Sequence, residues 1–139
     1  IDQVLKAVVG PLLSLETARP KGTAVFMKLL GRAYAETQGH LRRFMQENYA
    51  RDLMRFTKFL HRALPELAPS EMFWRLHFML GTVIFTLAGS EALHDIAEAD
   101  FAESVDTKKI LARLIPFLSA GIRAQAEVMP LKLASISPA

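Results

Sequence analysis

One place in this chain has the spacing of a metal site on a helix. Glu91 and His94 form a Glu-x-x-His motif. Helical bundles that hold two metal ions use two copies of this motif, so that side chains from facing helices converge on the ions. A second copy is missing, because His40 follows Glu36 by four residues rather than three. A helical-bundle metal-binding enzyme therefore stays open only as an alternative.

Nucleophilic and phosphate chemistry have no support in the sequence. The chain has no cysteine, no Gly-x-Ser-x-Gly motif and no glycine-rich loop after a strand. We therefore expect a protein that is not an enzyme and that has no cofactor and no metal. The absence of cysteine fits a reducing compartment, and we expect a cytoplasmic protein.

Arg75 is the residue best suited to bind an anion, because it lies in the most apolar part of the chain. A buried guanidinium needs an anionic partner. A ligand carboxylate or phosphate would supply one, and so would Glu71, four residues before it. Both interpretations stay open. For His77, two positions later, the pattern favours a role in the core or in a dimer seam.

A set of adaptable or hydrogen-bonding side chains could line an apolar cavity with few polar anchors. Methionines of this kind are also ordinary core residues, and threonines can bond back to the preceding helical turn. The residues predicted to contact a ligand are Met27, Leu30, Tyr34, Met45, Tyr49, Met54, Arg75, Met79, Thr82 and Thr86.

The elements that must position these side chains are all helices, since no stretch alternates like a strand. We expect an all-α fold with six helices at about 4–15, 23–37, 40–46, 47–64, 72–88 and 107–126. Gly10-Pro11 should bend or divide the first helix, and Pro116 should bend the last. Asp106 is the expected N-cap of the last helix, after a polar connector at 98–106. Pro69 can occupy the first turn of the helix before that connector. Residues 1–126 would form one domain, with a tail at 127–139.

The helix predicted over Met72–Ala88 is apolar around its whole circumference, so it must be covered on all sides. Its 17 residues are fewer than the roughly 20 that a bilayer core needs, and Arg75 and His77 interrupt it. We expect no membrane partner. With 51% hydrophobic and 22% charged residues, the composition is rich enough in apolar side chains to indicate an additional buried interface.

A second copy of the chain is the expected partner, because two helices from each copy can form a four-helix bundle about a two-fold axis. Gly81 would permit close approach of the backbones. The residues predicted at this interface lie on the fifth and sixth predicted helices, and they are Trp74, Phe78, Gly81, Phe85, Leu111, Leu114, Leu118 and Ile122. Two alternatives stay open: both stripes face the chain's own core, or the chain is a helical protein-interaction domain.

Direct binding to nucleic acid has weak support. A basic row, Arg51, Arg55, Lys58 and Arg62, follows one face of a predicted helix and could contact phosphates. The formal net charge is only +3, and such a row is usually a solvated helix side. We do not expect this chain to read DNA by itself.

Three stretches resemble the C-terminal half of TetR-type transcriptional regulators. They are FMKLLGRAYAETQGHLRRFMQENYARDLMRFTKFLHRALP, ALPELAPSEMFWRLHFMLGTVIFTLAG and ILARLIPFLSAGIRA. The likeness extends from about Val4 to Arg123. Within the family the chain is most similar to the PsrA-like branch, whose members respond to fatty acids or their acyl derivatives.

The resemblance to the family implies an effector-binding and dimerisation region with a small apolar ligand. The resemblance to the PsrA-like branch implies that this ligand is a fatty acid or an acyl derivative. The family's helix-turn-helix domain would precede Ile1, and operator DNA would be bound only through it. Ligand entry would shift the first helix and change the spacing of two DNA-reading heads, which decides affinity for paired half-sites. Whether the protein represses or activates stays open.

Overall fold

The computed structural model describes residues 1–35 and 39–125, which contain helices and no strands. Six helices follow one another: α1 (Asp2–Ala18), α2 (Gly22–Ala35), α3 (His40–Ala63), α4 (Pro69–Ala88), α5 (Ser90–Phe101) and α6 (Thr107–Arg123). The all-α prediction is confirmed. The predicted tail at 127–139 lies outside the described residues.

The number of helices matches the prediction, but their division differs. The helices expected at 40–46 and 47–64 are one continuous helix, α3. Asn48, a weak helix former, is accommodated because its Nδ2 donates to the carbonyl of Phe44 at 2.9 Å. α1 and α6 also run on through Pro11 and Pro116, so the first helix is not divided.

α5 is a helix that the sequence analysis did not predict. None of its residues is buried, and its last turn, 98–101, lies in the stretch that was expected to be a polar connector. It ends where Ala102 adopts a left-handed conformation with φ 51°. There the backbone N–H groups of Ala102 and Glu103 donate to the carbonyls of Glu98 and Ala97, a common end for an α-helix.

Two expected helix starts are confirmed. The Asp106 carboxylate accepts a hydrogen bond of 2.7 Å from the backbone N–H of Lys109, and so caps α6. Pro69 occupies the first position of α4, where its missing N–H leaves no hydrogen bond unmade.

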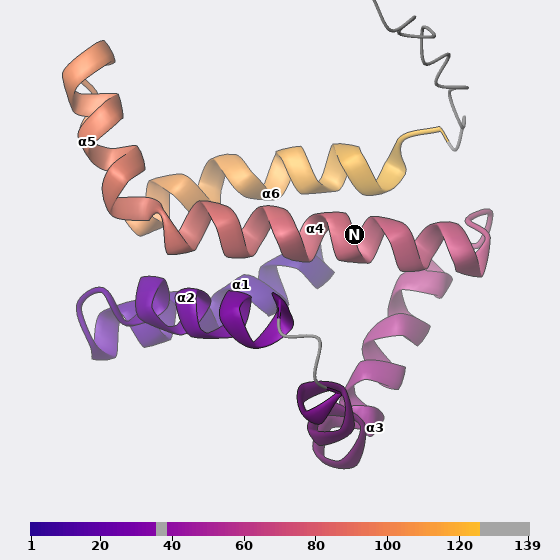
Figure 1. Ribbon diagram of the computed structural model, residues 1–139. Coiled ribbons are helices and arrows are strands. Elements are labelled where there is room, and N and C mark those ends of the chain that lie inside the picture. The colour runs from indigo at the N-terminus through magenta and orange to yellow at the C-terminus, as the bar shows by residue number, and fades with distance from the viewer. Residues whose placement is uncertain (36–38, 126–139) are drawn as a thin grey trace, which may run out of the picture.

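α4 is the central helix of the fold (Figure 1), with α6 antiparallel on one side and α2 on the other. α1 packs against α6 and α2. The main core lies among α1, α2, α4 and α6, and its buried residues are Leu5, Val9, Met27, Leu87, Leu111, Leu114 and Leu118. A second cluster of Leu60, Met72 and Ile122 joins α3, α4 and α6.

The turn between α1 and α2 is fixed by side-chain hydrogen bonds. The Glu16 carboxylate accepts from the backbone N–H groups of Lys21 and Thr23 at 3.0 and 3.2 Å. The buried hydroxyl of Thr23 donates to the carbonyl of Leu12 at 2.8 Å. Farther along α2, a Cβ at Gly31 would lie 3.0 Å from Cγ2 of Ile84, so this glycine allows α2 to approach α4 closely.

Within residues 1–35 and 39–125, no single helix is long and apolar enough to cross a membrane. α4 and α5 taken together are long and apolar enough, but the two helices are bent by 68° relative to each other.

Candidate interaction face and ligand site

α4 exposes a row of aromatic side chains. Trp74, Phe78 and Phe85 are 54%, 65% and 78% exposed, and the rings of Trp74 and Phe78 stack with centroids 6.1 Å apart. Gly81 lies in the same row, and a Cβ added there would meet nothing within 4 Å. We call these four residues the aromatic face. Its position on one side of the central helix leaves a large apolar surface open to a partner.

The α6 residues predicted at the interface are not available to a partner. Leu111, Leu114, Leu118 and Ile122 are between 1% and 7% exposed and belong to the two core clusters of the same chain. The structure therefore corrects this part of the prediction. The broad apolar stripe of α6 packs against α1, α3 and α4 of the same chain.

α6 offers a different apolar residue at its surface. Phe117 is 66% exposed, and Gly121, one turn later, has open space around its Cβ position. The sequence analysis missed Phe117 because this residue lies off the main apolar stripe of the helix. An aromatic side chain that falls outside the core stripe of an amphipathic helix is the signal that could have found it.

Arg75 has structural partners. Its Nε donates to the Glu71 carboxylate at 2.8 Å, and its Nη1 donates to the carbonyls of Ile122 and Ala124 at 2.8 and 2.6 Å. The residue is 7% exposed. It thus satisfies carbonyl groups at the end of α6 that the helix itself cannot satisfy. These contacts are those of the structural alternative, and a ligand contact of Arg75 stays a prediction.

The other predicted ligand residues do not form one site. Met27 is buried in the main core, and Leu30 and Met79 pack half-buried against it. Thr82 donates back to the carbonyl of Phe78 at 2.8 Å, and Thr86 is half-buried. The side chain of Met45 lies outside the described residues. Three residues of the predicted set are exposed, namely Tyr34, Tyr49 and Met54.

Tyr34 on α2 lies near α4. Its ring is 6.2 Å from that of His77, and His77 in turn lies 4.1 Å from Phe73. The imidazole Nδ1 of His77 donates to the carbonyl of Phe73 at 2.7 Å. Tyr34 therefore lies beside His77 and Phe73 of α4. The other two exposed residues of the predicted set, Tyr49 and Met54, lie on α3.

α3 has an uncovered apolar surface. It packs on the rest of the chain through its last turns, where Leu60 is fully buried and Phe56 and Leu64 are partly buried. The earlier turns stand away from the other helices (Figure 1). The large apolar side chains exposed on α3 are Phe44, Tyr49, Met54 and Phe59. Such a surface is expected to be covered by a ligand or by another protein surface.

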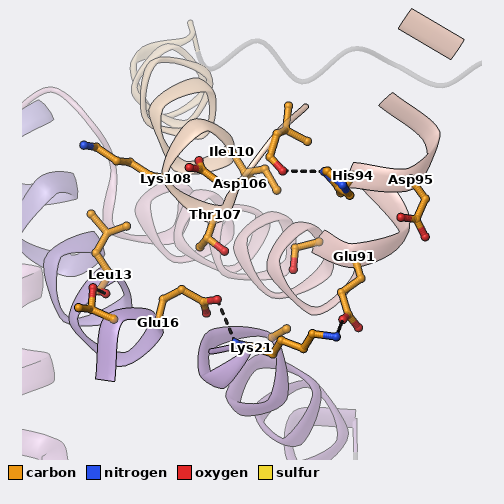
Figure 2. A pocket seen from close by; sticks show the side chains of 14 residues that line it. Leu13, Glu16, Lys21, Glu91, His94, Asp95, Asp106, Thr107, Lys108 and Ile110 are labelled. Atoms are coloured by element: carbon orange, nitrogen blue, oxygen red, sulfur yellow. Dashed lines mark hydrogen bonds and ion pairs between the residues drawn. The ribbon is translucent and has the colours of Figure 1, made fainter. Parts of the chain in front are cut away.

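A cavity of about 960 Å³ lies elsewhere, between the α1–α2 turn, α5 and the start of α6. Figure 2 shows Glu16 and Lys21 on one side and Glu91, His94 and Asp95 on another. None of the ten predicted ligand residues lines it. Six of its fourteen lining residues are charged, whereas the site of an apolar ligand has only a few polar groups. Sequence reasoning missed this cavity because its lining residues come from four separate stretches.

The Glu-x-x-His motif contributes to this cavity through structural contacts. Glu91 pairs with Lys21 at 2.5 Å. His94 donates from Nδ1 to the carbonyl of Val105 at 2.8 Å, and its Nε2 lies 3.3 Å from the carboxylate of Glu98. Within the described ranges, no three histidine, aspartate or glutamate residues are grouped as a metal site requires.

The ion pair of Lys21 and Glu91 gives the stability a defined pH dependence. The hydrogen bond and charge of Glu91 raise the pKa of Lys21 above 10.5, and those of Lys21 lower the pKa of Glu91 below 4.5. The pair therefore stabilises the fold above the ordinary pKa of glutamate and below that of lysine. That stability is lost as the pH falls through the lowered pKa of Glu91 or rises through the raised pKa of Lys21.

We expect a Glu91→Gln chain to melt at a slightly lower temperature than the wild type at about pH 7, because exposed pairs stabilise only weakly. The difference should shrink toward zero at a pH well below 4.5, as the pH falls through the lowered pKa of Glu91. Melting followed by circular dichroism measures both values. Glu66→Gln, at an exposed carboxylate in the turn before α4, is the control and should lack this change. An equal difference between wild type and Glu91→Gln at both pH values would contradict the assignment.

One family of known domains matches the chain. A family model described as "Tetracyclin repressor-like, C-terminal domain" matches residues 6–121. The matched range includes α2 to α5 entirely and most of α1 and α6. Among curated proteins, none matches the chain.

Proposed function

Because the chain belongs to the tetracyclin repressor-like C-terminal domain family, we propose that it is the ligand-sensing and dimerisation domain of a TetR-type transcriptional regulator. The observation that carries this proposal is the aromatic face of α4, which is open in the single chain. Proteins of this class are regulators and not enzymes, and operator DNA would be bound through a separate helix-turn-helix domain.

Dimerisation through the aromatic face would cover the apolar side of α4 that the chain's own helices leave open. Each fully buried aromatic or aliphatic side chain contributes about 1.5–3 kcal/mol. Trp74, Phe78 and Phe85 on α4 and Phe117 on α6 occur twice in a symmetric dimer. Burial of this many aromatic side chains is typical of stable homodimers.

The ligand that we propose is a small apolar molecule, and a fatty acid or acyl derivative follows from the likeness to the PsrA-like branch. The uncovered apolar side chains of α3 support an apolar ligand, because a fatty chain would shield Tyr49 and Met54 from water. α3 is anchored mainly by its last turns. A ligand can therefore change the position of α3 without disrupting the main core.

Movement would then reach the DNA-binding domain through α1. The side chains of Leu5 and Val9 pack on α6, and the Ser119 hydroxyl donates to the Asp2 carboxylate at 2.6 Å. A shift of α1 relative to α6 has to change these contacts. Under this proposal, the ligand favours one of two positions of α1 by binding one of them more tightly.

Thermal unfolding with decanoate and with palmitate tests the ligand class. A ligand at 100 times its Kd stabilises by about 2.7 kcal/mol, so we expect a clear rise in Tm for the wild type. Met54→Glu should remove most of that rise, because it places a charge on the proposed apolar wall without removing a buried side chain. Ala99→Glu on α5 is the matched control. No rise with either acid, or an equal rise in Met54→Glu, would contradict this ligand site.

A further inference from the structure

α3 and α5 carry opposite charge. α5 has four carboxylates and no lysine or arginine. α3 has six arginine or lysine residues and two carboxylates. The basic row Arg51, Arg55, Lys58 and Arg62 is exposed, and the structure gives it no salt bridge within the described part of the chain. Such a row attracts an acidic surface by charge complementarity.

The two helices are too far apart to neutralise each other within one chain. α3 ends shortly before the first residue of α4, and α5 begins shortly after the last residue of α4. α4 has 20 residues, and at a rise of 1.5 Å per residue it separates them by about 30 Å. Figure 1 shows α5 projecting upward at one end of α4 and α3 projecting downward at the other.

A two-fold dimer can bring the two helices together. If the axis is perpendicular to α4, the two α4 helices are antiparallel, and α5 of one copy lies at the end from which α3 of the other copy departs. If the axis runs along α4, both acidic helices lie at one end and both basic helices at the other. Like charges placed side by side are unfavourable, so the charges favour the perpendicular axis.

α5 and α3 also offer apolar side chains for such a contact. Ile96 and Phe101 on α5 are 53% and 75% exposed. Phe59 on α3 is 52% exposed and lies between Arg55 and Arg62 on the helix, four residues after one and three before the other. Each of the two surfaces therefore combines exposed aromatic residues with charge of one sign.

We propose that α5 of each copy docks on the basic row of α3 of the second copy, with Ile96 against Phe59. This inference rests on the proposed dimer and extends it. The contact covers the middle and last turns of α3, where Met54 of the proposed ligand surface lies, with the other subunit. The ligand site of each copy is thereby completed and controlled by its partner.

Charge reversal tests the contact. Asp95→Lys/Asp100→Lys on α5 and Arg55→Glu/Arg62→Glu on α3 should each raise the dimer Kd at least tenfold at 50 mM salt. Both effects should be several-fold smaller at 500 mM salt because of screening. The chain with all four substitutions should return to within about threefold of wild type, since the charges are exchanged. Lys28→Glu/Arg32→Glu on α2 is the matched control and should leave Kd unchanged.

Several results would overturn the proposal. One is a dimer Kd that neither double variant changes. Another is a chain with all four substitutions that dimerises no more tightly than either double variant. Because the chain has no cysteine, a bismaleimide cross-linker gives a second measurement. The Ile96→Cys/Phe59→Cys chain should form a covalent dimer, and Ile96→Cys alone should not. A covalent dimer of the Ile96→Cys chain alone would indicate parallel α4 helices and contradict the proposal. If wild type itself is a monomer, the proposed function fails and not only this contact.

Discussion

Phe78→Glu is expected to be monomeric at protein concentrations where the wild type is a dimer. In the single chain Phe78 is 65% exposed, so the substitution leaves the core unchanged. In a dimer it would bury two unpaired carboxylates near the two-fold axis. The cost of leaving a buried charge unpaired is about 3–5 kcal/mol, which corresponds to at least a 100-fold increase in Kd. Sedimentation velocity over a range of concentrations measures this change.

Two further substitutions separate interface loss from unfolding. Val25→Glu, at a residue of α2 that is 51% exposed, is the matched control and should remain a dimer. Gly81→Leu adds bulk where the single chain has open space, and leucine favours a helix more than glycine does. It should therefore raise the melting temperature of the monomer while weakening the dimer. A Phe78→Glu chain that dimerises as tightly as the wild type contradicts the interface.

Arg75→Met is expected to lower the free energy of unfolding by about 3 kcal/mol. Methionine keeps much of the side-chain volume, so the loss comes from the polar contacts. The substitution removes the donor to the carbonyls of Ile122 and Ala124 and leaves the partly buried Glu71 without its cation. Urea unfolding followed by circular dichroism measures the change.

Glu71→Gln is the comparison for Arg75→Met, because it removes one charge and leaves the two carbonyl contacts in place. We expect it to cost about 1 kcal/mol. If Arg75 bound a ligand instead, Arg75→Met would remain as stable as the wild type in the absence of ligand and would lose only its response. Unchanged stability of that variant would therefore contradict the structural role.

The helices could be predicted where an apolar period or an end signal marks them. The starts at Pro69 and Asp106 follow from local chemistry and are found as expected. α5 could not be found in this way, because it buries none of its residues and its end is set by the conformation of Ala102. The division expected near Glu47 is absent because no proline or glycine interrupts the helix there.

Apolar periodicity could not decide which surface each stripe contacts. Leu111 and Leu118 on α6 and Phe78 and Phe85 on α4 all occur at helical spacing. The first pair fills the chain's own core and the second pair is exposed. What distinguishes α4 is that it has apolar residues on every side, more than the neighbouring helices can cover. A surplus of that kind is the stronger indicator of a partner.

Polar contacts across the fold were the least predictable part. The acceptors of Arg75 at the end of α6 are 47 and 49 residues away in sequence. The sequence shows that a buried arginine needs partners, and Glu71 was one of the two kinds named. It does not show that α6 ends beside α4. The end of α6 lies beside α4 because both helices pack around Leu60 and Met72, and only the folded structure shows this packing.

Sedimentation equilibrium of the unmodified chain tests the central claim most directly. The exposed aromatic row on α4 predicts a mass of twice 15.5 kDa at micromolar concentration. It also predicts that the fluorescence of Trp74, the one tryptophan, shifts toward that of a shielded indole as the dimer forms. A single-chain mass throughout, with Trp74 fluorescence independent of concentration, would contradict the account.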